Sequence, residues 1–317
     1  MNINYPSVDI VICAYNDKKL TAKCIDSLRA LSYPYFRIIL VDDCSPDDSV
    51  SFLSNKYPDI TIIENKKNLG PAKARNVGIK ISKAKYIVTM DNDATLSSDW
   101  LVKMVELMES DQTIGQAVGK IIFPDCPTKL AAAGGSMRFR CKSYDIGMGE
   151  SINNPKYNNI RKILVACSAS MIVRRDVLDL IGGFFDVYYH GYEDSDLSFR
   201  INIAGYKVIY YPKAISYHFL SKTVNHTIGK KRVYYWMRNR LLLMLRNYGF
   251  KSLIRYLPVN IRFTLSDCRS HPERIIPVLL SWFWIIFHLP SIIMQRKVIN
   301  NYRKINDKDL HKLFNLE

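Results

Sequence analysis

The stretch at residues 85–93, KYIVTMDND, constrains the fold more than any other part of the chain. Five of the six residues at 86–91 are apolar or β-branched, which predicts a short buried strand. The strand ends abruptly at Asp91 and Asp93, which flank Asn92. Carboxylates spaced in this way at a strand end can turn toward one point and bind a hard divalent cation through oxygen. The alternative is an ordinary turn, because Asp and Asn are common turn residues.

Similar strands alternate with helices through the preceding sequence. Apolar and β-branched runs predict strands at 8–13, 37–41 and 60–63, and apolar residues at helical spacing predict helices at 18–31, around 49–53 and at 71–82. Such alternation predicts an α/β fold with a mostly parallel, doubly wound sheet. Tyr15, Asp43, Asp91 and Asp93 would then gather at one sheet edge, where a nucleotide could lie. The sequence contains no G-x-G-x-x-G or P-loop, which argues against a dinucleotide fold or an NTPase.

The middle of the chain continues the pattern less regularly. We expect a helix at 100–108, a strand at 114–123, a strand at 163–173 with a short helix to Leu180, and a turn with a last strand within 205–212, which residues 215–218 follow. Residues 124–160 are rich in Gly, Asn and Pro without sustained periodicity, which predicts a long irregular loop region. Loops of this length are usually functional or disordered.

A second group of acids follows the sequence GGFFD. Asp186, Glu193, Asp194 and Asp196 lie in a segment that is otherwise aromatic and apolar. Burial in such surroundings can raise the pKa of a carboxylate into the range of a useful base. The alternative is a solvated N-cap with first-turn acids for a helix at 196–204, and both interpretations can hold together.

Four motifs in order, VICAYND, VDDCSPDDS, NLGPAKARNVG and MDND, are similar to the nucleotide-sugar half of family 2 glycosyltransferases with the GT-A fold. The resemblance covers about residues 8–218. It implies that Tyr15 and Asp43 contact the nucleoside, and that the D-x-D motif binds a Mn or Mg ion together with ribose or diphosphate. The donor-binding residues implied in this way are Ala14, Tyr15, Asp43, Asp91 and Asn92, and the metal ligands are Asp93 and Asp91.

The resemblance extends to the acceptor side, and we expect the loop region at 124–160 to form the wall that sets acceptor and sugar specificity. In this family the aspartate of the Glu-Asp pair after GGF is the catalytic base, which implies Asp194 here, while Glu193 shapes the acceptor site and Asp196 supports the helix start. A lone histidine such as His218 is more often structural than a ligand. In this family, however, a histidine at this distance often completes the metal shell, and neutral imidazole binds Mn²⁺ beside carboxylates. Arg75 follows the NLG loop. It is either a second cation for the donor phosphates, since guanidinium matches phosphate geometry, or a helix-surface charge.

The charge distribution and the cysteine content limit which partners and which cellular compartment are expected. The formal net charge is +16. After Ser221 there are eighteen Lys or Arg against five Asp or Glu, a net of +13, which leaves +3 for the rest. The C-terminal third is therefore expected to meet phosphates, of anionic lipid or of nucleic acid. Seven scattered cysteines without C-x-x-C spacing favour a reducing compartment. The apolar run at the N-terminus lacks a preceding basic region, so we expect no secretory signal.

Two apolar segments in this basic third predict contact with a membrane. Residues 230–248 form a basic amphipathic helix pattern, and residues 275–294 carry no Lys, Arg, Asp or Glu over a length just sufficient to span a bilayer. Because Pro277 and Pro290 interrupt the second segment and basic residues flank both ends, an interfacial element is favoured over a spanning helix. A helix pair buried on the catalytic domain is the further alternative. We expect a catalytic domain at 1–221 and a membrane-associating basic helical region at 222–317.

The sequence thus predicts an inverting, metal-dependent glycosyltransferase that uses a nucleotide-diphosphate sugar and a glycan or lipid-linked glycan acceptor. The run at residues 231–239 and the spacing of GGF to E-D-x-D are similar to rhamnosyltransferase-like members that build cell-surface polysaccharides. This implies a peripheral or monotopic position on the cytoplasmic face of a membrane.

Two rival functions remain open. A sugar-phosphate nucleotidyltransferase is expected to show a glycine-rich phosphate loop near its N-terminus, and none is present. A catalytically inactive protein that binds nucleotide sugars or nucleic acid explains the basic third but leaves the acidic motifs without a purpose. We expect no nucleic-acid partner. Salt-sensitive binding to DNA, compared with anionic liposomes, separates the last interpretation from a membrane-bound enzyme.

Overall fold

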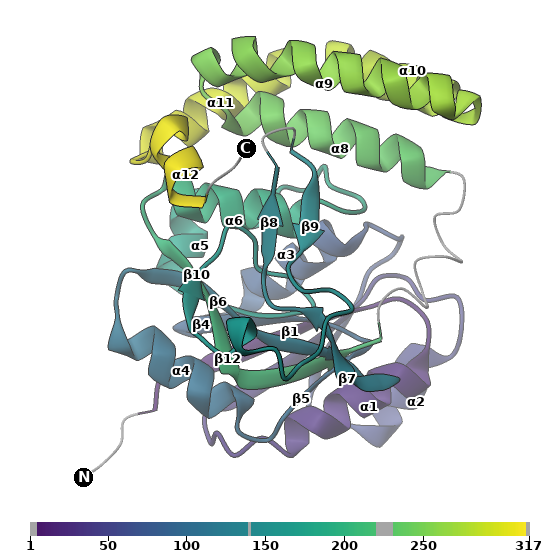
Figure 1. Cartoon of the computed structure of the whole chain (residues 1–317). Helices are drawn as coiled ribbons and strands as arrows, with labels where there is room; N and C mark the ends of the chain where they lie inside the picture. Colours follow the sequence, from purple (N-terminus) through teal and green to yellow (C-terminus); the bar gives the residue numbers. More distant parts are fainter. Residues whose placement is uncertain (1–4, 139–140, 220–230, 315–317) are drawn as a thin grey trace.

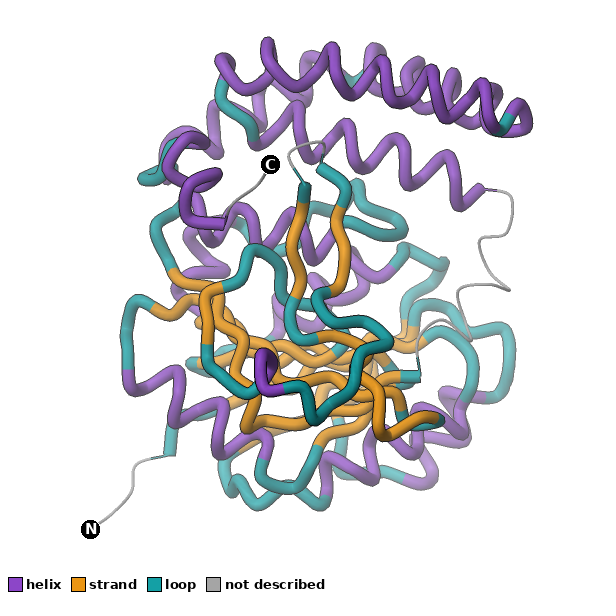
Figure 2. Tube along the Cα trace, viewed as in Figure 1, coloured by secondary structure: helices purple, strands orange, loops and turns teal. Residues whose placement is uncertain are grey.

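A ten-stranded sheet runs through the part of the chain that the computed structural model describes, residues 5–138, 141–219 and 231–314 (Figure 1). Its main path has the order β10-β12-β6-β11-β4-β1-β2-β3, with β5 paired to β12 and β7 paired to β6. A separate two-stranded ribbon, β8-β9, rises from the sheet toward the C-terminal helices (Figures 1 and 2). The α/β class expected from the sequence is confirmed.

The first half of the sheet is parallel, as predicted. Its strands are β1 (Val8–Ala14), β2 (Phe36–Asp42), β3 (Thr61–Glu64) and β4 (Tyr86–Asp91). The register pairs Ala14 with Asp42 and Cys13 with Asp91, so β1, β2 and β4 end at one level. The acidic segments that follow these strands therefore meet at one edge of the sheet.

Helices cover both faces of this half because its strands are apolar on both sides. Ile10 and Ile12 of β1 pack into one core cluster, whereas Val11 packs into the other, which follows the period of two in a strand. One cluster includes apolar residues of α1 and α4. The other includes residues of α3 and of the helices near the C-terminus. The helices are α1 (Lys18–Arg29), α2 (Ser49–Lys56), α3 (Pro71–Ile81) and α4 (Trp100–Ser110).

The second half of the sheet mixes strand directions and corrects three predictions. Residues 124–160 contain paired strands, since β7 folds back on β6 and β8 pairs with β9. The strand expected at 163–173 occupies only its end, and 207–218 is one strand with a register shift between Tyr211 and Ile215. Two- and three-residue strands are too short for periodicity to reveal. The elements are β5 (Ala94–Leu96), β6 (Ile114–Phe123), β7 (Cys126–Ala132), β8 (Gly135–Met137), β9 (Ser143–Asp145), η1 (Pro155–Tyr157), β10 (Arg161–Lys162), β11 (Ser170–Arg174) and β12 (Lys207–His218).

The C-terminal helices lie on the face of the sheet that α3 covers (Figure 1). Leu241, Leu243, Ile285 and Ile299 belong to the same buried cluster as Val11 of β1, so the core continues into these helices. The domain boundary predicted at 221/222 lies outside the described residues. The helices from the second half onward are α5 (Arg175–Ile181), α6 (Glu193–Ile203), α8 (Arg232–Asn247), α9 (Phe250–Ser270), η3 (Pro272–Arg274), α10 (Ile275–Phe287), α11 (Leu289–Tyr302) and α12 (Asp307–Phe314).

The apolar segment at 275–294 is divided between two helices. Among the described residues no single helix is long and apolar enough to cross a membrane. Residues 272–287 (η3 and α10) and α11 are long and apolar enough when taken together, but a bend of 65° separates them. Pro290 stands in the first turn of α11, where its missing N–H costs nothing. Val278, Ser281, Ile285 and Ile292 are buried, while many of their apolar neighbours are exposed. Each helix therefore has one packed side and one open side.

Asp196 anchors the C-terminal helices to the sheet domain. It lies in the first turn of α6, which begins at Glu193, three residues earlier than expected. Its fully buried carboxylate accepts hydrogen bonds from Arg200 at 2.7 Å, from Arg246 at 2.9 Å and from Asn247 at 2.8 Å. Arg246 and Asn247 belong to α8, so Asp196 joins two helices as well as supporting the start of its own.

Replacing Asp196 with alanine is expected to lower the free energy of unfolding by roughly 3–5 kcal/mol, because two buried guanidinium groups lose their carboxylate. Urea unfolding measures this loss. Asp179→Ala is the control, since Asp179 makes only an exposed ion pair at 3.7 Å and a change of less than about 1 kcal/mol is expected. Equal effects of the two substitutions would refute the anchoring role.

Candidate active site

Asp43 follows β2 at the carboxyl edge of the sheet, and its carboxylate accepts three hydrogen bonds. Its Oδ1 accepts hydrogen bonds from Asn65 Nδ2 and Leu69 N, both at 2.9 Å, and its Oδ2 accepts from Gly70 N at 2.8 Å. Burial raises the pKa of Asp43, and these hydrogen bonds oppose that rise. Asp43 N in turn donates to the carbonyl of Ala14 at 2.8 Å, which fixes the end of β1 beside it. A carboxylate oxygen accepts two bonds, so Oδ2 has capacity for an N–H of a bound base.

Aromatic side chains surround this carboxylate. Tyr189 donates from its hydroxyl to Asn68 Oδ1 at 2.7 Å and stacks on Tyr235 of α8 at 5.3 Å between ring centroids. Burial raises the pKa of Tyr189, and the nearby Tyr235, Asp43 and Tyr15 raise it further. A Cβ at Gly70 would lie 2.6 Å from the carbonyl oxygen of Tyr189, so glycine is required at this approach. Tyr15 and Asp43 thus share one corner with a tyrosine pair.

The structure brings Asp91, Asp93 and His218 together. His218 ends β12 and pairs with Ala94 of β5, which directly follows the D-x-D motif. His218 Nε2 lies 3.1 Å from an oxygen of Asp93 and 3.7 Å from an oxygen of Asp91. Asn92 donates to Asn16 O at 3.1 Å and to Thr21 Oγ1 at 3.0 Å, which holds the turn against α1. The turn expected as the alternative is therefore real, and it also presents both carboxylates to the histidine.

These three side chains fit a divalent cation. One ligand atom from each lies within 4.8 Å of the others, and two carboxylates with an imidazole suit Mn²⁺ or Mg²⁺. Burial lowers the pKa of His218, but the hydrogen bond to Asp93 and the charges of Asp93, Asp91 and Asp145 outweigh it and leave the pKa raised. The excess negative charge that raises this pKa is the charge that a cation would balance.

Arg75 connects the two acidic motifs. It is 1% exposed, so the interpretation as a helix-surface charge is wrong. One Nη lies 2.5 Å from Asp91 and the other 3.3 Å from Glu193. Burial works against the charge of Arg75, but Asp91 and Glu193 outweigh burial and raise its pKa. Its role toward donor phosphates stays a prediction, whereas its role as a bridge between the motifs follows from these distances.

Asp194 stands at the start of α6 in an acidic, poorly hydrated place. Tyr192 precedes the helix with a left-handed φ of 73°, a conformation that side chains other than glycine rarely adopt. Burial, then the charges of Glu193 and Asp145, raise the pKa of Asp194 to about 7. Both sequence interpretations hold in part, since the acids occupy the first turn of a helix but Glu193 is buried rather than solvated. Asp194 has the pKa of a general base that works near neutral pH.

Asp194 lines a cleft of about 380 Å³, which we call the acceptor cleft because the sequence predicts that the acceptor binds beside Asp194. Lys142 and strand β9 contribute to its lining on one side, and α8, α9 and η3 contribute the remaining large side chains. Of residues 124–160, those that line the cleft are Lys142, Ser143, Tyr144 and Asp145, and the expected role of this region in acceptor and sugar specificity stays a prediction. The lining residues are Lys142, Ser143, Tyr144, Asp145, Val165, Gly191, Tyr192, Asp194, Ser195, Trp236, Met237, Arg240, Phe263, Asp267 and Arg274.

Sequence reasoning missed three residues of this site. Asp145 lies in the cleft with Asp194, and burial raises its pKa. Asn65 and Tyr189 support the corner at Asp43. Asp145 stands on a three-residue strand in a stretch without periodicity, and Tyr189 lies between two motifs in a loop. No local signal distinguished either residue, because their neighbours in the site come from distant parts of the chain.

Comparison with known proteins agrees with this geometry. Residues 9–180, more than half of the chain, match the family described as Glycosyl transferase family 2. The chain is 36% identical over 121 residues to poly(ribitol-phosphate) beta-glucosyltransferase of Bacillus spizizenii, covering 35% of this chain and 19% of the relative. It is 23% identical over 256 residues to poly-beta-1,6-N-acetyl-D-glucosamine synthase of Staphylococcus epidermidis, covering 76% and 56%. The chain thus spans about half or less of the length of these relatives.

The fold also matches a solved structure. GalNAc-T7 with UDP, GalNAc and Mn²⁺ superposes with a TM-score of 0.65 at 13% identity, over 92% of this chain and 58% of that chain. The likeness shows that the fold is the GT-A fold expected from the sequence.

Asp194→Asn is expected to stabilise the protein at pH 8 but not at pH 4. The folded pKa of about 7 lies above the value near 3.9 of an unfolded aspartate, so between these values the folded state holds a proton that the unfolded state has lost. The free energy of unfolding of the native protein therefore falls as the pH rises through this window. The asparagine side chain of the Asp194→Asn variant does not titrate, so the variant lacks this fall. The gain should reach a few kcal/mol, at about 1.4 kcal/mol per unit of pKa.

Urea unfolding in chelator at several pH values tests this expectation. Asp179→Asn removes an exposed carboxylate and should give a difference from the native protein that does not grow with pH. A gain for Asp194→Asn that is the same at pH 4 and pH 8 would show that the carboxylate is not buried at a cost.

Proposed function

This chain belongs to glycosyltransferase family 2, and we propose that it is an inverting, metal-dependent glycosyltransferase that moves a sugar from a nucleotide-diphosphate sugar to a hydroxyl of a glycan or lipid-linked glycan. One observation carries the proposal. Buried Arg75 pairs with Asp91 of the D-x-D motif and with Glu193 of the E-D-x-D motif. Because the candidate base Asp194 directly follows Glu193, a metal-binding group and the candidate base flank the same site. Cell-surface polysaccharide synthesis is the proposed process, in keeping with the relatives named above.

The donor lies along the carboxyl edge of the sheet in this proposal. Asp43 Oδ2 accepts a hydrogen bond from the nucleobase, and Tyr15 contacts the nucleoside beside it. Ala14 and Asn92 shape the strand ends that form the floor. Asp91, Asp93 and His218 hold a Mn or Mg ion, which would neutralise charge on the departing diphosphate as a Lewis acid.

Asp194 acts on the acceptor. Its carboxylate removes the proton from the acceptor hydroxyl while that oxygen forms a bond to the anomeric carbon. The bond from the anomeric carbon to the diphosphate oxygen breaks on the opposite face, and its electron pair leaves with the nucleoside diphosphate. A single displacement of this kind inverts the anomeric centre. The raised pKa of Asp194 suits the task, because a base titrating near the working pH takes up the proton readily.

The two rival functions explain less. A nucleotidyltransferase is expected to carry a glycine-rich phosphate loop near its N-terminus, which this sequence lacks, and it has no use for a base such as Asp194 beside the candidate metal ligands. A binding-only protein has no use for a carboxylate whose burial costs stability.

The proposal extends to a place on the cytoplasmic face of a membrane, with anionic lipid as partner. Sixteen large hydrophobic side chains on α9, α10 and α11 are exposed, and we call them the apolar face. Exposed Lys251, Arg255, Arg262, Arg269 and Lys297 stand on the same helices. The members of the apolar face are Phe250, Ile254, Val259, Ile261, Leu265, Ile275, Ile276, Leu279, Leu280, Phe283, Ile286, Phe287, Leu289, Ile293, Met294 and Val298.

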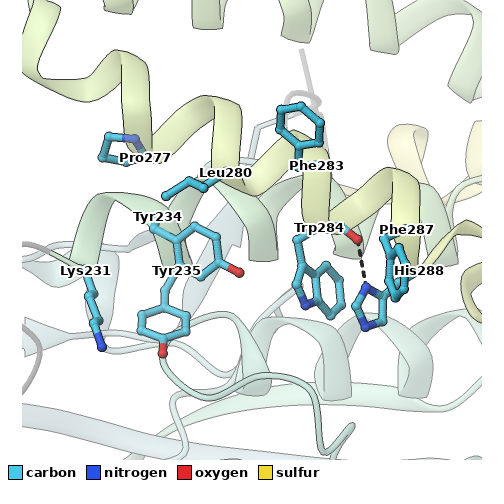
Figure 3. Close-up of a pocket in the computed structure, with 9 residues that line it drawn as sticks. All are labelled: Lys231, Tyr234, Tyr235, Pro277, Leu280, Phe283, Trp284, Phe287 and His288. Atoms are coloured by element: carbon cyan, nitrogen blue, oxygen red, sulfur yellow. Dashed lines mark hydrogen bonds between the residues drawn. The ribbon is translucent and has the colours of Figure 1, made fainter.

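This combination fits a bilayer surface better than water or nucleic acid. An exposed apolar patch of several helices marks an interaction surface, and basic residues at its rim attract anionic lipid headgroups. A groove of about 680 Å³ between α8 and α10 opens on the apolar face and is lined by Tyr234, Tyr235, Leu280, Phe283 and Phe287 among others (Figure 3). Phe283 and Phe287 are 71% and 84% exposed. A nucleic acid would leave these side chains without an apolar partner.

Release of nucleoside diphosphate from UDP-, dTDP- and GDP-sugars is expected to occur with one donor, to need Mn²⁺ or Mg²⁺ and to stop in chelator. Asp93→Ala and Asp194→Asn should each reduce it by roughly 10²-fold or more, because one loses a ligand to the metal and the other the base that activates water or acceptor. Asp59→Asn, at an exposed carboxylate, is the control and should retain the native rate. Variants as active as the native protein would refute the proposed roles.

Vesicle sedimentation tests the membrane proposal. The double variant Ile276→Asp/Phe283→Asp should bind vesicles of phosphatidylcholine with one-third phosphatidylglycerol at least tenfold more weakly, since burying each of these side chains contributes about 1.5–3 kcal/mol. Binding by the native protein should weaken as salt rises, because charge attraction is screened. The control Leu180→Asp changes an exposed residue of α5 and should bind like the native protein. Equal binding by both variants would show that the apolar face does not meet lipid.

A further inference from the structure

The hydroxyl of Ser195 lies against the candidate base. Ser195 follows Asp194 in the first turn of α6 and is 2% exposed. Its backbone N–H donates to Asp194 Oδ1 at 2.6 Å, and its side-chain hydroxyl donates to the same oxygen at 3.2 Å. One oxygen of the carboxylate is therefore held by two donors from a single buried residue.

Ser143 of strand β9 extends this contact to the β8-β9 ribbon. Its hydroxyl oxygen lies 2.9 Å from that of Ser195 and 3.5 Å from the carbonyl oxygen of Ser136 on β8. The backbone of Ser143 also hydrogen-bonds the side chain of Tyr192, which directly precedes α6. Strand β9 is thus tied to the start of α6 at two points.

The direction of these hydrogen bonds follows from the charge of Asp194. A hydroxyl carries one hydrogen, and an ionised carboxylate can only accept. Because a hydrogen bond to an ionised group is stronger than one between neutral groups, Ser195 donates to Asp194 and accepts from Ser143. The longer contact of Ser143 with Ser136 is the weaker alternative for the same hydrogen. When Asp194 ionises, the two hydroxyls therefore align toward it, and each strengthens the next.

The other oxygen of Asp194 is left for the acceptor. Within the described part of the chain, no hydrogen bond reaches Asp194 Oδ2, and Asp194 is partly exposed where it lines the acceptor cleft. A general base must lie within hydrogen-bond reach of the proton that it removes. The oxygen without donors is the one that has room for such a contact.

We propose that Ser195 and Ser143 are positioning residues, which hold Oδ1 of Asp194 so that Oδ2 takes the proton from the acceptor hydroxyl. This inference rests on the proposed function and adds two residues to its site. In this arrangement neither serine touches the reacting atoms. Ser195 acts on Asp194 directly, and Ser143 acts through Ser195. A strand that lines the cleft thereby also orients the base.

Several other groups face Asp194. Those whose charges bear on its ionisation are Glu193 of α6, Asp145 of β9 and Arg75 of α3. Burial raises the pKa of Tyr192 to about 12 and the pKa of the Cys167 thiol well above its ordinary value, so both stay neutral up to pH 9. The other charged residues that line the cleft are Lys142, Arg240, Asp267 and Arg274. All these groups are the same in the native protein and in serine variants, so a difference in pH dependence reports the contact with Asp194.

Release of nucleoside diphosphate at saturating donor and Mn²⁺, from pH 6 to pH 9, tests the assignment. Ser195→Ala should move the midpoint of the kcat profile up by about one pH unit, and Ser143→Ala by less, because the ionised base loses hydrogen bonds. The value of kcat should therefore fall by up to about tenfold at pH 6 and much less at pH 9, while the KM for the donor stays within twofold. A purely structural role would lower kcat equally at every pH or raise KM.

Two further variants separate the parts of the chain of hydrogen bonds. Ser143→Thr keeps the hydroxyl at a partly exposed strand position and should behave like the native protein. The double variant Ser143→Ala/Ser195→Ala should be no slower than Ser195→Ala, because Ser143 acts through Ser195. Additive losses, or equal losses in Ser143→Thr and Ser143→Ala, would overturn the chain. Ser110→Ala is the control, since this exposed serine of α4 donates to Leu107 O at 2.7 Å, and it should retain the native profile.

Urea unfolding in chelator gives a second readout that needs no activity. The folded pKa of Asp194, about 7, means that the carboxyl is protonated in the folded state at pH 5 and ionised at pH 9. A hydroxyl that donates to the ionised form favours that form. Ser195→Ala should therefore lower the folding equilibrium constant more at pH 9 than at pH 5, by up to about tenfold. In the Asp194→Asn background this difference between the two pH values should vanish.

The two readouts distinguish the inference from the proposed function. Absence of nucleoside diphosphate release by the native protein, together with the expected unfolding pattern, would refute the proposed enzyme while leaving the hold on Oδ1 in place. Losses of stability from Ser195→Ala that are equal at pH 5 and pH 9 would overturn the hold itself.

Discussion

Arg75 is a cation buried between two acidic motifs that lie far apart in the chain. Removing a guanidinium from water is costly, and only close carboxylates with good geometry offset the cost. Asp91 and Glu193 supply them, at 2.5 Å and 3.3 Å. The ion group therefore fixes β4, α3 and α6 relative to one another. Asp91 is itself a candidate metal ligand and Asp194 directly follows Glu193, so the distance across the site depends on Arg75.

A second buried ion group does the same for the C-terminal helices. Asp196 binds Arg246 and Asn247 of α8, and the hydrophobic core continues from the sheet into α8, α10 and α11. The helices that carry the apolar face are thereby held against α6, whose first turn contains Asp194. One wall of the acceptor cleft consists of α8, α9 and η3, so the cleft exists only because these helices pack where they do. The apolar face therefore has a fixed position relative to Asp194, the candidate base.

Much of the fold followed from pattern alone. The alternation of strands and helices through residue 123 predicted β1 to β4 and α1 to α4 to within a few residues, because these strands are apolar on both faces and end in polar turns. The pattern failed at residues 124–174. Strands β8, β9 and β10 have only two or three residues each, and β7 is exposed over its first four residues and buried over its last three, so none of them shows a readable period. It also placed the start of α6 three residues late, since the first-turn acids Glu193 and Asp194 carry no apolar signal.

The sequence by itself determined which chemical groups stand at the strand ends, because in a parallel sheet the residues after each strand share one edge whatever the details of packing. In this way the sequence predicted that Tyr15, Asp43 and the D-x-D pair lie at one edge of the sheet. The family resemblance added Asp194 and His218 to the predicted site. Only the tertiary structure decided the environments of these groups. The burial of Arg75, the pKa of Asp194 and the presence of Asp145 beside it arise from contacts between distant segments. Such contacts leave no local pattern, because each depends on where another part of the chain comes to rest.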